Sequence, residues 1–205
     1  MLAGRGDGTI FPQVRTLPPS SIRHRDMNAL VRRAAPEDAE SIATVHIESW
    51  QTAYRGQLPD PYLDQLDLEL VRRTEFWRMH IATPRPNTEI WVACGSAHAE
   101  GFAALGPARD ADPNSTGEVY AIYVQPRQWN QGLGRALFTH ATNRLASLGF
   151  STAILWVLES NARARRFYEI AGWSLDGATK LETLPGGIEL REVSYRIMFR
   201  HRNEE

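Results

Sequence analysis

The stretch of the chain best suited to chemistry is a glycine-bearing turn, Asn130-Gln131-Gly132-Leu133-Gly134-Arg135. It lies between a strand-like segment and a segment with helical spacing. Glycines let a backbone turn tightly and bring its N–H groups against a ligand. Because the start of a helix offers unpaired N–H donors and a partial positive charge, the expected ligand is a phosphate or pyrophosphate. The same glycines would also suit an ordinary strand–helix turn, and the turn alone leaves both interpretations open.

The elements on either side predict how this turn is held. Residues 118–124 alternate as a strand should, which predicts Val119, Ala121 and Tyr123 on one face and Tyr120, Ile122 and Val124 on the other. Pro126 ends this strand. Apolar residues then recur at helical spacing from Leu133 to Leu148, and Gly149 is a natural helix stop.

Composition excludes several classes of protein. With 205 residues, 42% apolar and 23% charged, the chain is long enough for one globular domain. A net charge of -1 and a pI of about 6.6 argue against a dedicated nucleic-acid or anionic-membrane binder. Cys94 is the single cysteine, which excludes an intrachain disulfide and a cysteine-rich zinc site and favours a cytoplasmic setting. We find neither metal-ligand spacing among the histidines nor an apolar run long enough to span a membrane.

The chain divides into two parts. Residues 1–26 are rich in Gly, Pro, Arg and Ser and lack a sustained apolar period, which predicts an arm that is either flexible or docked on another surface. Residues 27–205 form the predicted single domain. Strands are expected at residues 30–33, 89–94, 99–105, 118–124, 152–158, 177–183 and 189–199, and helices at residues 36–50, 68–81, 133–148 and 161–171, with residues 54–66 as a loop. This order predicts a mixed sheet with helices on its faces.

The order of elements and four stretches of sequence resemble the GNAT superfamily of acetyl-CoA-dependent N-acetyltransferases. The stretches are WQTAY at 50–54, AIYV with the Gly132-Leu133-Gly134 turn, NARARRFYEIAGW at 161–173 and LPGGIELREVSYRI at 184–197. The family turn begins with Gln or Arg, whereas this chain has Trp129 there. The resemblance covers about residues 31–200 and implies an α+β fold. Its largely antiparallel sheet would contain a central, splayed parallel strand pair, with helices on both faces.

The resemblance implies acetyl-CoA as co-substrate and no metal. Its pantetheine arm would lie between the strand at 118–124 and the strand at 153–157, against main-chain groups of Ile122, Tyr123 and Val124. The residues implied around the pyrophosphate are Trp129, Asn130, Gln131, Gly132, Leu133, Gly134 and Arg135. Asn161 and Ala164 would complete the cofactor site from the following helix, although Asn161 would equally suit the N-cap of that helix.

The catalytic residues implied by the resemblance are Tyr168 and Glu118. Tyr168 would meet the cofactor sulfur as proton donor to the departing thiolate, and aromatic packing is the alternative. Glu118 lies fourteen positions before Gly132, where some family members keep a base. The alternative for Glu118 is a solvated residue at a strand start. Trp50 and Tyr54 would bind the acceptor, while core packing explains Trp50 about as well.

The predicted function is therefore transfer of an acetyl group from acetyl-CoA to a primary amine by direct attack. A small-molecule amine is favoured, and a protein amine is the alternative acceptor. We expect no nucleic-acid or membrane partner, and a homodimer is possible. A non-catalytic acyl-CoA-binding or sensor module is the rival from another class. Such a module would need neither Glu118 nor Tyr168, so the presence of both favours an enzyme. The acceptor itself is not identified by the sequence.

Overall fold

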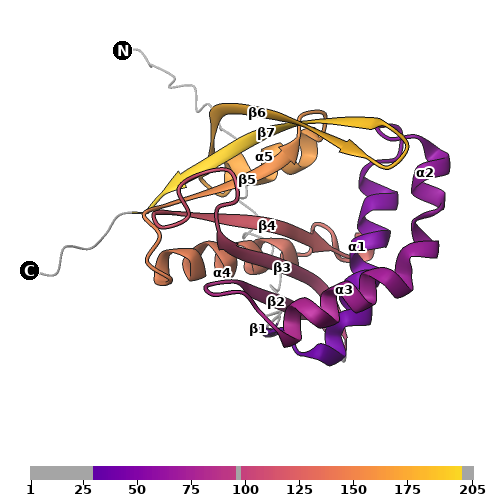
Figure 1. Cartoon of the computed structure of the whole chain (residues 1–205), viewed down its shortest axis with the longest axis horizontal. Helices are drawn as coiled ribbons and strands as arrows, with labels where there is room; N and C mark the ends of the chain where they lie inside the picture. The colour runs from indigo at the N-terminus through magenta and orange to yellow at the C-terminus, as the bar shows by residue number, and fades with distance from the viewer. Residues whose placement is uncertain (1–29, 96–97, 200–205) are drawn as a thin grey trace, which may run out of the picture.

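The computed structural model describes residues 30–95 and 98–199, and Figure 1 shows the course of the chain. The predicted arm at residues 1–26 lies outside the described residues. Within the described part, no helix combines the length and the apolar character needed to cross a membrane.

The core of the fold is a seven-stranded sheet with the order β1-β2-β3-β4-β5-β7-β6. Its strands are β1 (Leu30–Arg33), β2 (Glu89–Cys94), β3 (Ala99–Pro107), β4 (Thr116–Val124), β5 (Thr152–Leu158), β6 (Ser174–Leu184) and β7 (Ile188–Met198). The central pair β4–β5 is parallel, and the other neighbouring pairs are antiparallel. The predicted α+β class, with a largely antiparallel sheet and one central parallel pair, is confirmed.

The helices are α1 (Ala39–Ala53), α2 (Asp60–Asp64), α3 (Leu70–Ala82), α4 (Leu133–Ser147) and α5 (Ala162–Ile170). The prediction of a loop over residues 54–66 was wrong, because this stretch contains α2. Pro61 occupies an early helical position, where its fixed φ is favourable. Leu63 and Leu66 are buried, so tertiary packing stabilises a helix too short to show a periodic pattern.

Helices cover both faces of the sheet, as predicted. Alternate strand residues point to opposite faces, so Ile90 and Val92 of β2 belong to the cluster formed with α1 and α3. Trp91 and Ala93 belong to the cluster formed with α4 and α5. Phe138 of α4 is fully enclosed in that second cluster.

One prediction for β4 was wrong, because the strand does not alternate evenly. Ala121 pairs with Ala104 of β3 and Val119 pairs with Leu105, so Tyr120 is an extra residue in a β-bulge. The side chains of 119, 122 and 124 therefore pack toward α4, and those of 120, 121 and 123 pack toward α1. A bulge depends on the partner strand, which explains why the alternation in one strand did not predict it.

Candidate active site

The parallel strands β4 and β5 separate halfway along their length. They pair from Thr116 and Thr152 to Val119 and Leu155, yet β4 continues to Val124 and β5 to Leu158. The residues of β4 are buried up to position 119 and become partly exposed from 120 to 123. The predicted splay of the central pair is thus confirmed, and it opens at the bulge.

The antiparallel pairing with β3 determines which peptide groups of β4 face the splay. The N–H of Gln125 donates to the carbonyl of Glu100 at 2.8 Å. Because peptide groups alternate along a strand, those of Tyr123 then point to β3, and those of Ile122 and Val124 point to the splay. Main-chain contact with a ligand in the splay is therefore available at Ile122 and Val124. The predicted main-chain contact at Tyr123 was wrong, because its peptide groups point to β3.

Two side chains donate hydrogen bonds to the carbonyl of Val124 at the end of β4. Ser49 of α1 donates its hydroxyl to this oxygen at 3.0 Å, and Trp129 donates its indole Nε1 at 2.7 Å. The guanidinium of Arg163, at the start of α5, lies 3.6 Å from the Trp129 ring centroid. Trp129 thus lies beside the splay, and its predicted contact with the cofactor stays a prediction. Sequence reasoning missed Ser49, because only the docking of α1 on β4 brings it to this position.

The glycine turn presents unpaired donors at the start of α4. Gly132 has a left-handed backbone with φ of 89°, and its carbonyl accepts the first helical bond, from the N–H of Ala136 at 3.0 Å. The N–H groups of Leu133, Gly134 and Arg135 therefore precede the first possible intrahelical acceptor. A Cβ built on Gly132 would meet no atom within 4 Å. The turn has the geometry of an anion-binding helix start.

Gly134 brings the turn against both neighbouring elements. A Cβ at this position would lie 3.6 Å from Val124 of β4 and 4.0 Å from Phe167 of α5. Asn161 caps α5, since its Oδ1 accepts the N–H of Ala164 at 3.0 Å. The N-cap interpretation of Asn161 is therefore confirmed, and its contact with a cofactor stays a prediction. The start of α5, the turn and the end of β4 converge at one place.

Tyr168 projects from α5 into the sheet and is 8% exposed. Its ring packs at 5.2 Å from Phe138 and at 6.0 Å from Tyr195, centroid to centroid. Burial raises the pKa of its hydroxyl above the ordinary value for tyrosine. Tyr168 therefore keeps its proton throughout the physiological pH range, as a donor to a leaving group must.

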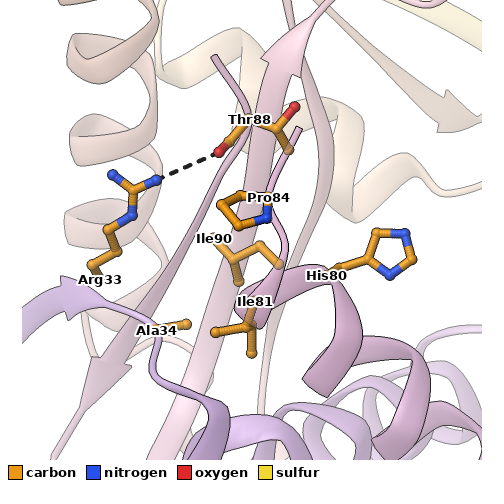
Figure 2. A pocket seen from close by; sticks show the side chains of 7 residues that line it. All are labelled: Arg33, Ala34, His80, Ile81, Pro84, Thr88 and Ile90. Atoms are coloured by element: carbon orange, nitrogen blue, oxygen red, sulfur yellow. Dashed lines mark hydrogen bonds between the residues drawn. The ribbon is translucent and has the colours of Figure 1, made fainter. Parts of the chain in front are cut away.

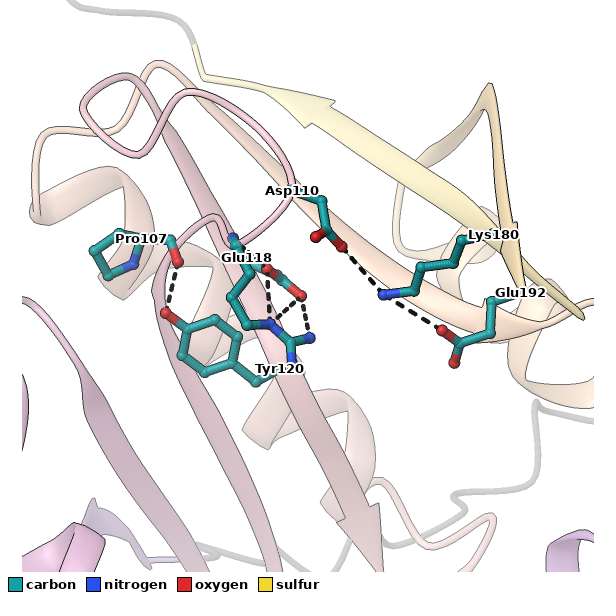
Figure 3. Close-up of polar contacts among 7 residues, drawn as sticks. Pro107, Asp110, Glu118, Tyr120, Lys180 and Glu192 are labelled. Atoms are coloured by element: carbon teal, nitrogen blue, oxygen red, sulfur yellow. Dashed lines mark hydrogen bonds and ion pairs between the residues drawn. The ribbon is translucent and has the colours of Figure 1, made fainter. Parts of the chain in front are cut away.

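Glu118 does not lie in solvent, so the alternative of a solvated residue was wrong. Its side chain is fully buried. Its two oxygens accept from Arg109, at 2.9 Å from the backbone N–H and at 2.5 Å from a guanidinium Nη (Figure 3). The same guanidinium lies 5.0 Å from the ring of Tyr120. A role as base stays a prediction for Glu118, with the added condition that Arg109 must turn away from it.

A second carboxylate lies on β7, which is separated from β4 by β5. Figure 3 shows Lys180 of β6 between Asp110 and Glu192, with Nζ–oxygen distances of 3.2 and 3.5 Å. Burial raises the pKa of Glu192. Sequence reasoning missed Glu192, because a charged residue in an alternating strand usually faces solvent.

Trp50 and Tyr54, which are predicted to bind the acceptor, belong to a cluster of aromatic side chains on the α1 side of the splay. The rings of Trp50 and Tyr54 meet edge to face at 5.0 Å. His46, one turn before Trp50, stacks on Tyr123 of β4 at 4.8 Å. Burial raises the pKa of both tyrosines. We call His46, Trp50, Tyr54 and Tyr123 the aromatic cluster.

His46 makes the stability of the fold sensitive to acid. Burial lowers its pKa to about 3, against about 6.5 when unfolded. Because the unfolded chain binds this proton first, His46 contributes full stability above pH 6.5 and loses it as pH falls toward 3. We expect the unfolding free energy of the protein to fall between pH 7 and pH 5 by at most roughly 2 kcal/mol more than that of His46→Phe. Urea unfolding at both pH values measures this, and parallel losses would contradict it.

The cavity in Figure 2 is too small to be the active site. It lies between α3 and the start of β2, and its lining includes Arg33, His80 and Ile90. Its volume of about 20 Å³ is enough for roughly one water molecule. A larger hollow of about 310 Å³ lies between α1 and the turn at Pro126–Arg127, close to the end of β4.

Comparison with known proteins places this geometry in a family. Residues 47–173 match the model of the acetyltransferase (GNAT) family. An uncharacterized N-acetyltransferase of Bacillus subtilis, YuaI, is 36% identical over 166 residues, covering 80% of this chain and 89% of its own. A probable N-acetyltransferase of Mycobacterium tuberculosis is 28% identical over 173 residues, covering 83% and 94%.

Solved structures share the fold at low identity. The PaiA N-acetyltransferase of Thermoplasma acidophilum, in complex with coenzyme A, aligns with a TM-score of 0.62 at 19% identity, over 82% of this chain and 98% of its own. YncA of Salmonella typhimurium, a putative acetyltransferase solved with acetyl-CoA, has a TM-score of 0.62 at 18% identity, over 86% and 98%. With a family model that spans the splay, the glycine turn and α5, the chain belongs to the GNAT acetyltransferase family.

Proposed function

We propose that this protein transfers an acetyl group from acetyl-CoA to a primary amine of a small molecule, by direct attack of the neutral amine. The observation that carries the proposal is the splay of β4 from β5 beside an exposed helix start. Two structural neighbours that share this fold hold coenzyme A or acetyl-CoA. The lone cysteine, Cys94, supports a reducing, cytoplasmic setting.

The residues of the splay fit the parts of this co-substrate. The three N–H groups at the start of α4 suit the pyrophosphate, because the helix dipole adds positive charge at the same point. The N–H and carbonyl of Ile122 and the N–H of Val124 suit the amides of the pantetheine arm. Asn161 uses Oδ1 for its cap, so its Nδ2 is the atom that we assign to the cofactor.

In the reaction, acetyl-CoA supplies a thioester carbon that forms a bond to the amine nitrogen while the carbon–sulfur bond breaks. A main-chain N–H of β4 facing the splay would stabilise the negative charge that develops on the carbonyl oxygen. Tyr168 would stabilise the departing thiolate with its hydroxyl. Its raised pKa favours a hydrogen bond to sulfur over complete proton transfer.

The proton that the amine loses would pass to a carboxylate, and Glu118 and Glu192 are the two candidates that we consider on this side of the sheet. Glu118 is held by Arg109 through both oxygens. Glu192 has only Lys180 within ion-pair distance among the described residues, and burial raises its pKa above the ordinary value for glutamate. Since a base works best with a pKa near the working pH, we propose that Glu192 accepts the proton as the general base, with Glu118 as the second candidate.

This assignment predicts a pH-dependent loss of turnover in Glu192→Gln. An alkyl amine with a pKa near 10.4 is neutral in only about one molecule in a few thousand at pH 7. The loss should therefore be largest near neutral pH and should shrink as pH approaches the pKa of the amine. Matched pH–rate profiles of Glu192→Gln and Glu118→Gln on one amine measure it. If Glu118→Gln alone changes the shape of the profile, Glu118 is the base.

Three functions can be distinguished by which acceptor, if any, causes acetyl-CoA to release coenzyme A: acetylation of a small amine, acetylation of a protein amine, and acyl-CoA binding without catalysis. A panel of small amines, assayed by release of coenzyme A, should contain members that raise release well above hydrolysis. Release only with a peptide or protein amine would move the acceptor to the protein class. Tight acetyl-CoA binding with no amine-dependent release would favour a non-catalytic acyl-CoA-binding module.

A further inference from the structure

The positively charged guanidinium of Arg73, on α3, lies against the aromatic cluster. Its Nη1 lies 3.1 Å from Nδ1 of His46, and its guanidinium carbon lies 5.9 Å from the ring centroid of Trp50. Because His46 is neutral, its ring nitrogen can accept this hydrogen bond. Burial lowers the pKa of Arg73, so the charge is partly removed from water.

This charge has no acidic partner among the residues that the structure describes. Three other arginines near the sheet have acidic partners: Arg32 pairs with Asp38, Arg109 with Glu118 and Arg144 with Glu89. No carboxylate of the described chain lies within 4 Å of the Arg73 guanidinium. Glu69 lies one helical turn before Arg73 and its charge acts on the Arg73 guanidinium, but its carboxylate is paired with Arg72.

Two buried donors at this place lack a hydrogen-bond partner. They are Nε of Arg73 and Nε1 of Trp50, neither of which has a described acceptor with full hydrogen-bond geometry; the hydroxyl of Tyr123 lies beside the Trp50 indole and interacts with it. Buried donors are nearly always satisfied in folded proteins, and a partly buried, unpaired charge is costly. Both groups donate and neither accepts, so the missing partner is a group with acceptor oxygens.

The position of Arg73 relates this missing partner to the acceptor. His46 links Arg73 to Tyr123, whose side chain lies on the α1 side of the splay. Trp50 links it to Tyr54 in the same cluster. A ligand group at Arg73 would thus be on the acceptor side of the sheet, away from the glycine turn on α4.

We propose that Arg73 and Trp50 bind a carboxylate on the acceptor, so that the substrate class is amines that carry a carboxylate, such as amino acids. A guanidinium offers a planar pair of N–H donors that matches a carboxylate, and the indole N–H adds a third donor. The amine would then extend from this anchor toward the splay. This inference rests on the proposed function and adds the chemical class of its acceptor.

The test uses acceptor pairs that differ only in this group, namely α-amino acids each beside its carboxamide. For the amino acids that respond, the protein should prefer the acid by roughly 10- to 150-fold in kcat/KM, the usual value of charge-assisted hydrogen bonds. Arg73→Gln should abolish this preference by raising KM for the acid, with little change for the carboxamide. Arg78→Gln is the matched control, because Arg78 lies on the same helix and pairs with Glu75 at the surface.

Three results would overturn the inference: no preference in the unmodified protein, an equal loss for acid and carboxamide in Arg73→Gln, or a preference for phosphoethanolamine over every carboxylate. A second readout needs no turnover. N-acetyl amino acids should raise Tm for the unmodified protein and for Arg78→Gln but not for Arg73→Gln. If this shift appears while no amine releases coenzyme A, the anion site stands and the proposed function fails. If amines are acetylated but the protein shows neither a preference for the acid over the carboxamide nor a Tm shift with N-acetyl amino acids, only the anion site fails.

Discussion

Gly132→Val is expected to raise the Kd for acetyl-CoA by roughly 100-fold. The substituted side chain would extend into the open space beside the turn, where we propose that the phosphates approach the N–H groups of Leu133, Gly134 and Arg135. Losing about two charge-assisted hydrogen bonds costs roughly 3 kcal/mol, which is a factor of about 100 in Kd. Isothermal titration of acetyl-CoA into the folded variant measures the change.

Gly149→Val is the matched control for this experiment. Gly149 follows the other end of α4, has φ of 92° and is also in open space. Valine at either site must adopt an unfavourable left-handed backbone, so both variants should lose similar stability. Only Gly132→Val should lose affinity. Equal affinities in the two variants, both shown to be folded by their melts, would remove the turn from the cofactor site.

Tyr168→Phe is expected to lower kcat by roughly 10- to 100-fold with little change in acetyl-CoA affinity. The phenyl ring keeps the packing against Phe138, and only the hydroxyl is lost. An ordinary tyrosine pKa near 10 against about 8.5 for a thiol already makes proton transfer uphill by roughly 2 kcal/mol. Burial raises the tyrosine value further, so we expect the effect of a hydrogen bond, at or below the lower end for acid catalysis.

The control for Tyr168 removes a hydroxyl from its neighbour. Tyr195 lies 6.0 Å away, and its hydroxyl donates to Glu169 at 2.7 Å and accepts from Arg165 at 3.2 Å. Tyr195→Phe should lower stability and leave kcat near that of the unmodified protein. A kcat for Tyr168→Phe equal to that of Tyr195→Phe, with chemistry shown to be rate-limiting, would exclude Tyr168 from the reaction.

The sequence predicted the elements whose pattern is local. The strands at 89–94 and 152–158 were predicted with the bounds that the structure has. The stop of α4 at Gly149 agrees within one or two residues. The splay was predicted from the resemblance to the family. Periodicity within one strand could not reveal it, because the splay depends on where two strands stop pairing.

The features that sequence reasoning missed all depend on contacts between distant segments. The bulge at Tyr120 exists only against β3, and α2 is stabilised by the burial of Leu63. Glu118 lies at a strand start, yet it is enclosed because Arg109 folds back over it. Arg73 is unexceptional in an amphipathic helix, and only its contact with His46 and its buried, unsatisfied Nε distinguish it in three dimensions. Side-chain periodicity contains no information on such pairings.

The most direct test of the central claim is a mass balance on the unmodified protein. The protein is incubated first with acetyl-CoA alone and then with a responsive amine, while intact protein mass, coenzyme A and acetylated amine are measured. Direct transfer predicts no acetylated protein in the first step. It then predicts equal amounts of coenzyme A and acetylated amine, both dependent on Tyr168. An acetylated protein that passes its group to the amine, or coenzyme A released without acetylated product, would contradict direct transfer in the splay.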